Sequence, residues 1–430
     1  MNMKKSVFLA IIVCGISAPF RGQEVNYDES KVGFYTLEDP LRFVNGRKVK
    51  NQRDWAQRRQ EILDIFQREM YGQMPPKNNI YLEQKDEGTT LAGFGLRRQV
   101  RMWFRSDRTG PFIDWLIVTP RWVQAPVPAI ILLNYRGNHT VLPDKEIIET
   151  ESLETPTNLY PGGAARGLYA NPNEDTYFPV SMLLARGYAL VTACYCDISP
   201  DPTGVAEQEK YAYQRCFDLW PARDPARDDN TTSLGAWAWG LMRGMDMIEH
   251  DARLDASRVI LTGFSRLGKA ALIAGAFDER FPVVVPVQTG GGGVPLAKRN
   301  FGENIAIEVK AFTHWYCPAY RKYARHEDQM PFDQHLLLAS VAPRALLVEG
   351  FDEPWYDTKG EFLSVKAASP VWEKFCKKGL PRVEWPRDFD TSAIGERLGY
   401  VRRSEKHGIS ACDWTWMLDF ADRVFGARLN

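Results

Sequence analysis

The sequence predicts an α/β fold with a mainly parallel central sheet covered by helices on both faces. Two observations lead to this prediction. Strongly apolar runs of strand length alternate with helical stretches from residue 126 onward, and strands buried on both faces are typical of parallel sheets. In addition, residues 259–273 run from an apolar strand through glycine and serine into an Ala/Leu-rich helix. Sheets of this kind carry their active sites at the carboxyl ends of the strands.

The first half of the chain supplies a helix, antiparallel strands and two buried strands. Residues 53–70 have helical spacing, whereas 79–119 contain the polar/apolar alternation of antiparallel strands. Continuous apolar runs at 126–135 and 187–198 predict strands buried on both faces. The stretch 147–176 is rich in Gly, Pro, Asn and Thr and predicts a long surface loop.

The second half supplies the strands whose ends bear the chemically interesting residues. We expect Ser265, a glycine turn, a carboxylate segment and His407 to converge on one edge of the sheet, because each follows a predicted strand. The elements are a helix over 234–250, a strand–turn–helix over 258–276, a strand over 283–288, a turn at 290–293, strands over 345–350 and 398–401, and an amphipathic helix over 414–425.

Composition narrows the function classes. The chain has 430 residues, 44% hydrophobic and 25% charged, which is ordinary for a globular protein. Its formal net charge is zero and basic blocks are absent from the sequence, so a nucleic-acid surface is not expected. The seven cysteines are too sparse for a disulfide scaffold. We interpret most of them as buried small hydrophobes, with one or two disulfides open.

The N-terminus has the features of a secretory signal peptide. Two lysines precede an apolar run over 6–18 that ends in Gly, Ser and Ala. This run is too short to span a bilayer, and a buried N-terminal segment is the alternative. We therefore expect residues 1–22 to be removed and 23–430 to form a single catalytic domain. The protein is expected to be secreted or periplasmic, without a membrane span.

Ser265 is the candidate nucleophile. It follows Gly263 on a turn between strand and helix, where a serine stands exposed beside the amino end of the helix. Backbone N–H groups and the positive end of the helix dipole would face an oxyanion formed there. The spacing departs from G-x-S-x-G, because the second glycine, Gly268, comes one residue late.

A serine nucleophile needs a base, and the base needs an orienting carboxylate. His407 is the candidate base, since it alone among six histidines combines a late position, a preceding strand and a flexible Lys-His-Gly context. The acid should follow a strand between the serine and the histidine. Glu353 is favoured and Asp352 is the alternative; either could instead be a capping or surface carboxylate. His139 is either a second oxyanion donor or a structural hydrogen-bond partner.

Two cations flank the serine on the predicted helix. Arg266 comes directly after it, where a guanidinium could stabilise an oxyanion or hold a substrate carboxyl group. Lys269 lies one helical turn beyond Ser265 and therefore rises on the same face. Cations there suit an acidic or polyhydroxylated substrate, while a surface ion pair is the alternative.

The stretch Gly263-Phe-Ser-Arg-Leu-Gly-Lys269 resembles the G-x-S-R-x-G-K signature of the glucuronoyl esterases, carbohydrate esterase family fifteen. The resemblance spans about residues 30–427. Supporting motifs are Asn134-Tyr-Arg-Gly-Asn-His-Thr140, Lys298-Arg-Asn-Phe-Gly-Glu303, Asp333-Gln-His335, Ala342-Pro-Arg344, Trp355-Tyr-Asp-Thr-Lys-Gly-Glu361 and the region of His407.

This resemblance implies an α/β-hydrolase fold and serine esterase chemistry with no metal and no cofactor. The implied substrate is an ester of (4-O-methyl-)glucuronic acid on glucuronoxylan, with a lignin unit as the usual alcohol. Implied roles are nucleophile for Ser265, oxyanion stabiliser for Arg266, base for His407, and binding of sugar hydroxyls by Lys269, Glu303 and Trp355.

The chain departs from the fungal pattern of this family in its acid and its disulfide. Gln288 stands where fungal members carry a glutamate, and a neutral amide cannot compensate an imidazolium, which strengthens Glu353. Phe264 and Gly408 occupy the positions of two fungal cysteines, so packing and hydrogen bonds alone must position His407.

Two other functions stay open. The same residues could act on another carbohydrate ester, such as acetylated xylan. A noncatalytic carbohydrate-binding relative is the third possibility, and the set of Ser265, Glu353 and His407 argues against it.

Overall fold

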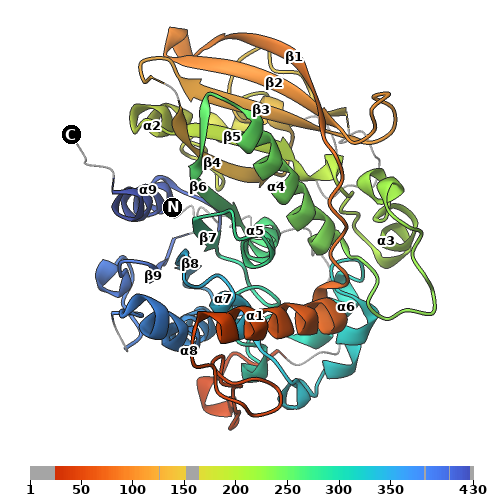
Figure 1. Ribbon diagram of the computed structural model, residues 1–430, viewed down its shortest axis with the longest axis vertical. Helices are drawn as coiled ribbons and strands as arrows, with labels where there is room; N and C mark the ends of the chain where they lie inside the picture. Colours follow the sequence, from red (N-terminus) through yellow and green to blue (C-terminus); the bar gives the residue numbers. More distant parts are fainter. Residues whose placement is uncertain (1–24, 125, 152–163, 382–383, 406, 427–430) are drawn as a thin grey trace, which may run out of the picture.

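The computed structural model describes residues 25–124, 126–151, 164–381, 384–405 and 407–426. A nine-stranded sheet runs through it in the order β1-β2-β3-β5-β4-β6-β7-β8-β9 (Figure 1). The pairs from β1 to β5 are antiparallel and the pairs from β5 to β9 are parallel. The strands are β1 Tyr81–Thr90, β2 Gly95–Trp103, β3 Phe112–Pro120, β4 Val127–Asn134, β5 Ala189–Cys194, β6 Leu254–Phe264, β7 Val283–Val287, β8 Ala345–Phe351 and β9 Leu398–Arg403.

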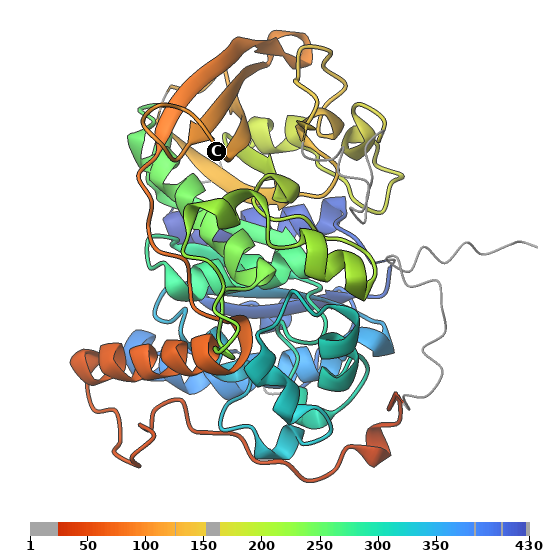
Figure 2. The ribbon, with the colours of Figure 1, turned by 90° about the vertical axis from the view of Figure 1, so that its right-hand side faces the viewer.

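Helices cover both faces of this sheet. In Figure 1, α4 and α5 lie on one side of it, and α2 and α9 lie on the other. Figure 2 shows α1 lying along the lower part of the molecule, far from β1 and β2 at the top. The helices are α1 Gln52–Phe66, α2 Val180–Ala185, α3 Val205–Tyr211, α4 Ser233–His250, α5 Arg266–Phe277, α6 Ile305–Ala311, α7 Gln334–Ala339, α8 Thr358–Cys376 and α9 Ala411–Phe425. The predicted α/β fold is confirmed.

The predicted elements agree with the structure within a few residues, with two differences. The helix expected over 53–70 ends at Phe66 and continues as a π-turn over Gln67–Tyr71. The sequence pattern gave no bounds for α2 and α3, or for α6, α7 and α8 between β7 and β9. The predicted signal peptide lies outside the described residues, as does 152–163 of the predicted surface loop. Within the described part of the chain, each helix is too short or too polar to cross a membrane.

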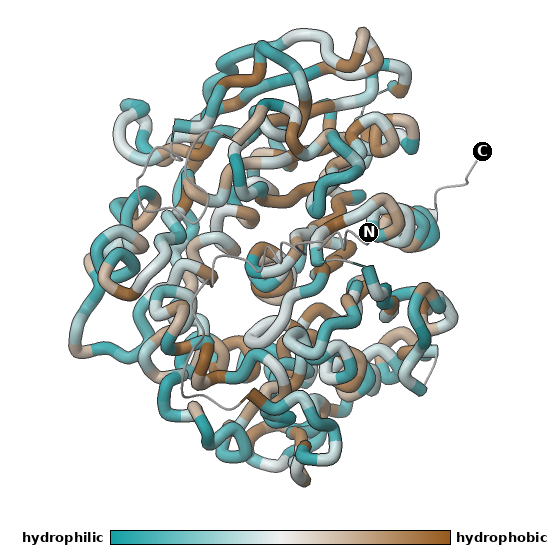
Figure 3. The backbone as a smooth tube through the Cα atoms, turned by 180° about the vertical axis from the view of Figure 1, so that it is seen from behind, coloured by the Kyte–Doolittle hydropathy of each residue, from teal (hydrophilic) through white to brown (hydrophobic). Residues whose placement is uncertain are grey.

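Two apolar clusters, one on each face of the sheet, form the core. The outermost loops in Figure 3 are mainly hydrophilic. Tryptophans are prominent among the fully buried side chains, and each contributes a large apolar area to the core; they include Trp115, Trp237, Trp239, Trp372 and Trp414. These tryptophans are therefore core residues, and Trp355 remains a half-buried candidate for sugar contact.

The described cysteines are free thiols. Four of them are buried, at 194, 196, 216 and 317, and two are half-buried, at 376 and 412. The disulfide left open by the sequence is therefore absent from the described residues, and the core is stabilised without it.

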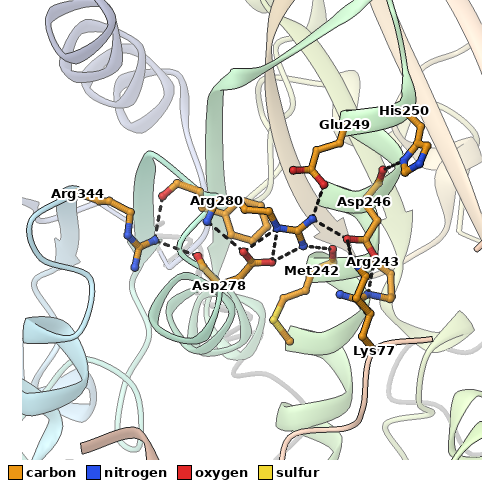
Figure 4. A network of polar contacts seen from close by, with 10 residues as sticks. Lys77, Met242, Arg243, Asp246, Glu249, His250, Asp278, Arg280 and Arg344 are labelled. Carbon is orange, nitrogen blue, oxygen red and sulfur yellow. Dashed lines mark hydrogen bonds and ion pairs between the residues drawn. The ribbon is translucent and has the colours of Figure 1, made fainter. Parts of the chain in front are cut away.

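An ion network holds the far ends of α4 and α5 at the amino edge of the parallel strands (Figure 4). The guanidinium of Arg280 lies 2.6 Å from Asp278, 2.6 Å from Asp246 and 2.5 Å from Glu249. Arg344 donates hydrogen bonds to the backbone carbonyls of Asp278 and Phe281. This network holds the C-terminal end of α5, which is the end far from the serine turn.

Gly268 lies where α5 meets the sheet, and an added side chain has no room. A Cβ atom there would lie 2.8 Å from the carbonyl oxygen of Gly263 and 2.9 Å from that of Val287. We expect Gly268→Ala to lower the free energy of unfolding by about 1–3 kcal/mol, because overpacking outweighs the better helix propensity of alanine. Urea unfolding measures this change. Gly33→Ala is the control, since nothing lies within 4 Å of its Cβ position, and equal stability of both variants would contradict the packing argument.

Candidate active site

Ser265 occupies a strained turn between β6 and α5. Its φ of 56° and ψ of −132° lie in a region that L-residues rarely adopt. The turn is held by the N–H of Ser265, which donates to Val287 O at 2.9 Å, and by the Tyr135 hydroxyl, which donates to Phe264 O at 2.6 Å. Since α5 begins at the next residue, the serine stands at the positive end of a helix.

His407 lies against this turn, in the loop after β9. Its ring stacks on Tyr356, with centroids 4.6 Å apart, and lies 5.5 Å from the ring of Phe264. Both sequence neighbours of Ser265 therefore act on the histidine. Phe264 packs against its ring, and the positive charge of Arg266 lowers its pKa. The predicted nucleophile and base are brought to one edge of the sheet.

Gln288 determines the tautomer of His407. Its Oε1 atom lies 2.9 Å from His407 Nδ1 and accepts the Gly408 N–H at 3.0 Å. Because a backbone N–H can only donate, the atom facing both groups is the amide oxygen. Nδ1 therefore carries the hydrogen, and Nε2 holds a lone pair. Nε2 is buried and forms no hydrogen bond with the described residues, so it can accept a proton from a nearby hydroxyl.

The surroundings of His407 favour its neutral form. Burial lowers the pKa of the imidazole to about 3, and the positive charges of Arg266, Arg403 and Lys269 act in the same direction. A base that is neutral throughout the ordinary pH range can take the proton of a serine hydroxyl.

The structure does not bring the predicted acid into contact with His407. Glu353 is half-buried just past β8, and burial raises its pKa. Within the described residues its side chain forms no hydrogen bond or ion pair with the histidine, whose Nδ1 is occupied by Gln288. Asp352 is exposed and pairs with Arg402 at 2.9 Å.

Two further acids past β8 are structural. Asp357 caps α8 by accepting the Gly360 N–H at 3.0 Å. It also pairs with Arg299 at 2.8 Å, in a contact where both side chains are buried. Glu361, in the first turn of α8, is fully buried.

Arg266 is held by Asp201, a residue that the sequence analysis missed. Asp201 accepts hydrogen bonds from Arg266 at 2.5 Å, His314 at 2.8 Å and Trp315 at 3.0 Å. Burial raises the pKa of this carboxyl, but Arg266 and the two ring donors outweigh it and hold the pKa well below its usual range. The guanidinium is thus a buried cation fixed beside the serine. The sequence feature that could have identified Asp201 is its position shortly after the predicted strand over 187–198.

Lys269 and Glu303 form a buried pair beside the same turn. Lys269 Nζ lies 3.7 Å from Glu303 Oε2, and both side chains are less than 10% exposed, so the alternative of a surface ion pair is wrong. Trp315 covers both cations, with its ring centroid 4.8 Å from Arg266 Cζ and 5.1 Å from Lys269 Nζ. Trp355 is adjacent, because its carbonyl accepts the Glu303 N–H at 2.9 Å.

A small hollow lies beside Glu303 and Trp355. It is lined by Glu303, Glu308, Trp355, Tyr356 and the glycine turn after β7. Acidic, aromatic and backbone groups therefore meet next to the lysine, and sugar hydroxyls bind to groups of this kind.

His139 has a structural role. Its Nε2 lies 3.2 Å from Ala164 O, and its imidazole is mostly buried, which lowers its pKa. Of the two possibilities left by the sequence, the structural hydrogen bond is the one present. Among the residues that the structure describes, no group of three or more His, Cys, Asp or Glu side chains could hold a metal ion.

Together these groups are suited to acyl transfer. Ser265 is half-buried on a strained turn rather than exposed as expected, His407 is a neutral imidazole whose Nε2 has no hydrogen bond among the described residues, and the fixed guanidinium of Arg266 lies nearby. A set of this composition can supply a nucleophile, a base and positive charge for the transition state of ester cleavage.

Known proteins are similar to this chain in sequence, some of them along nearly its whole length. The family described as "Glucuronyl esterase, fungi" matches residues 172–376. Carbohydrate esterase MZ0003 of an unknown prokaryotic organism is 34% identical over 92% of this chain and 91% of its own length. The 4-O-methyl-glucuronoyl methylesterase of Podospora anserina is 26% identical over 78% of this chain, which spans 60% of that protein.

Solved structures agree with these relatives. A glucuronoyl esterase from Solibacter usitatus has a TM-score of 0.84 at 35% identity and covers 92% of this chain and 100% of its own. A promiscuous CE15 esterase from a marine bacterial metagenome has a TM-score of 0.82 at 34% identity, covering 93% and 100%. Since relatives more than 30% identical align over almost their full length, this chain belongs to the glucuronoyl esterases of carbohydrate esterase family 15 and is a carboxylic ester hydrolase.

Proposed function

We propose that this esterase hydrolyses esters of (4-O-methyl-)glucuronic acid on glucuronoxylan, as in lignin–carbohydrate cross-links. The observation that carries the proposal is the buried pair of Lys269 and Glu303. Lys269 lies one helical turn after Ser265 on α5. A donor and an acceptor at that position match the hydroxyls of a sugar on the acid side of the ester. A small acetyl group would leave both side chains without a substrate contact. Trp355 adds an apolar edge beside them.

The chemistry follows from the positions of the side chains. Ser265 Oγ attacks the ester carbonyl carbon while His407 Nε2 takes its proton. Arg266 and the first N–H groups of α5 stabilise the resulting oxyanion. The C–O bond to the alcohol then breaks, and the imidazolium returns the proton to the leaving alcohol. Water attacks the acyl-serine by the same sequence and releases the free uronic acid.

Glu353 is proposed as the carboxylate that compensates the imidazolium. Gln288 orients His407 but carries no charge. Asp352 is already paired with Arg402. Glu353 lies on the segment that also supplies the stacking partner of the histidine, since its carbonyl accepts the Tyr356 N–H at 2.9 Å.

Residues 1–22 are proposed to be a signal peptide, with 23–430 as one catalytic domain that is secreted or periplasmic. The support is the charge and apolar pattern of the N-terminus. A polymeric cell-wall substrate also requires an enzyme outside the cytoplasm.

Ser265→Ala tests the reaction and the substrate together. We expect the wild-type protein to hydrolyse benzyl glucuronate and the variant to lose at least about 10⁴-fold in kcat, because the attacking atom is removed. Acetylated xylan is the comparison substrate. Faster release of acetate than of benzyl alcohol would indicate another carbohydrate ester, and no turnover of either ester would indicate a binding protein.

Two amide variants test the acid. Glu353→Gln is expected to lower kcat by about 10²–10⁴-fold, since the imidazolium loses its compensating charge, whereas Asp352→Asn should stay within about threefold. Both are measured with benzyl glucuronate across pH 5–9. Full activity of Glu353→Gln would contradict a role for this carboxylate in compensating the imidazolium.

Glu308 lies behind the Lys269–Glu303 pair and is fully buried. Burial raises its pKa to about 8, the negative charge of Glu303 adds to the effect, and Lys269 opposes it. The folded protein thus keeps Glu308 protonated at neutral pH, so that Lys269 faces one negative charge rather than two.

Glu308→Gln should reveal this pKa in the pH dependence of stability. A raised pKa means that the folded state binds the proton more tightly, so wild-type stability falls as pH rises from about 4.5 to about 8. The variant does not titrate there and should become progressively more stable relative to wild type over that interval. Urea unfolding at pH 5, 7 and 9 measures the difference. The exposed change Glu209→Gln provides the baseline, and a constant difference for Glu308→Gln would contradict the prediction.

A further inference from the structure

The loop that carries His407 is bounded by a buried ion pair. Arg403 is the last residue of β9, and Asp413 lies in the first turn of α9. Arg403 Nε lies 2.9 Å from Asp413 Oδ1, and Arg403 Nη2 lies 3.0 Å from Asp413 Oδ2. The side chains are 1% and 0% exposed. The two ends of the loop are therefore clamped together by a bidentate contact away from solvent.

The same guanidinium reaches into the loop. Arg403 Nη2 donates a hydrogen bond to the carbonyl oxygen of Gly408 at 3.1 Å. The N–H of Gly408 donates to Gln288 Oε1, the atom that also accepts from His407 Nδ1. Both polar backbone groups of Gly408 are thus engaged, and a continuous chain of hydrogen bonds runs from Arg403 to the imidazole.

The outer side of the loop is equally constrained. A Cβ at Gly408 would lie 1.7 Å from Asp175 O, and the glycine has a φ of 155° that other residues rarely adopt. Ile409 N–H donates to Asp175 O at 3.0 Å. The backbone next to His407 is therefore held between Asp175 on one side and Arg403 on the other.

We propose that Arg403 is a positioning residue for His407, acting through Gly408 as a latch together with Asp413. This inference rests on the proposed role of His407 as the base. No disulfide is present among the described residues to hold the loop, and a shift of about 1 Å in a catalytic group costs on the order of 100-fold in rate. Arg403 does not touch the reacting atoms in this scheme; it determines where Nε2 stands.

A second ion pair on α9 provides a control that distinguishes positioning of His407 from stabilisation of the helix. Arg186 pairs with Asp419 at 2.9 Å and also with Asp422, both near the far end of α9. It anchors the helix without contacting the histidine loop. Changes at either arginine should lower thermal stability, more so at the fully buried Arg403 than at the part-exposed Arg186, but only changes at Arg403 should lower the catalytic rate.

The experiment compares Arg403→Lys, Arg403→Met and the control Arg186→Lys. Lysine keeps the charge opposite Asp413 but cannot bind both Asp413 and the Gly408 carbonyl, so the variant should fold. Three quantities are measured well below the melting temperature: kcat, KM for benzyl glucuronate, and the rate at which a fluorophosphonate probe labels Ser265. Labelling requires the serine and its base but no sugar, so it does not depend on the substrate assignment.

For Arg403→Lys we expect kcat and the labelling rate to fall about 10-fold, while KM stays within about threefold of the wild-type value. For Arg403→Met we expect kcat and the labelling rate to fall about 100-fold. Arg186→Lys should keep both rates within about twofold. Unchanged rates in the Arg403 variants, or equal losses in the Arg186 control, would overturn the proposal. If Arg403→Met does not fold, Arg403→Lys decides.

The wild-type protein distinguishes this inference from the proposed function. If the probe labels Ser265 but benzyl glucuronate is not hydrolysed, the proposed substrate is wrong. The labelling rates of the variants then still test whether Arg403 positions His407. Absence of labelling in the wild type would overturn both.

Discussion

The close approach of α5 to β6 and β7 is the constraint on which the rest of the site depends. A Cβ at Gly263 would lie 2.4 Å from Leu267 O, and one at Gly268 would lie 2.8 Å from Gly263 O. The two glycines thus face each other across the turn, and neither position has room for a side chain. This packing forces Ser265 to a positive φ and directs the first N–H groups of α5 at the space where an oxyanion would form.

Around this turn, buried cations are matched by buried acids. Arg266 pairs with Asp201 and Lys269 pairs with Glu303, and Trp315 covers both cations. A buried charge without a partner costs several kcal/mol, so each cation needs its acid to be retained in the folded protein. The pairs also keep the positive charge at fixed positions beside His407, where it disfavours the imidazolium until negative charge develops on the substrate.

The histidine is oriented by an amide rather than by a carboxylate. Gln288 Oε1 accepts from both Nδ1 and the neighbouring backbone, which determines the tautomer and the ring plane. An amide offers no negative charge to the imidazolium, so the proposed mechanism requires a second group, Glu353, to compensate that charge. The ion pair of Arg403 and Asp413 extends the orienting part of this system to the backbone of the loop.

The sequence by itself predicted the α/β fold, the strained turn at Ser265 and the position of His407 after a strand. Apolar runs, glycines and chain order carry that information locally, and parallel strands bring their carboxyl ends to one edge whatever their detailed packing. It could not identify the partners of these residues. Asp201 lies 65 positions from Arg266, and Gln288 lies 119 positions from His407. The order of strands in the sheet differs from their order in the chain, so only the tertiary structure decided which buried polar groups meet.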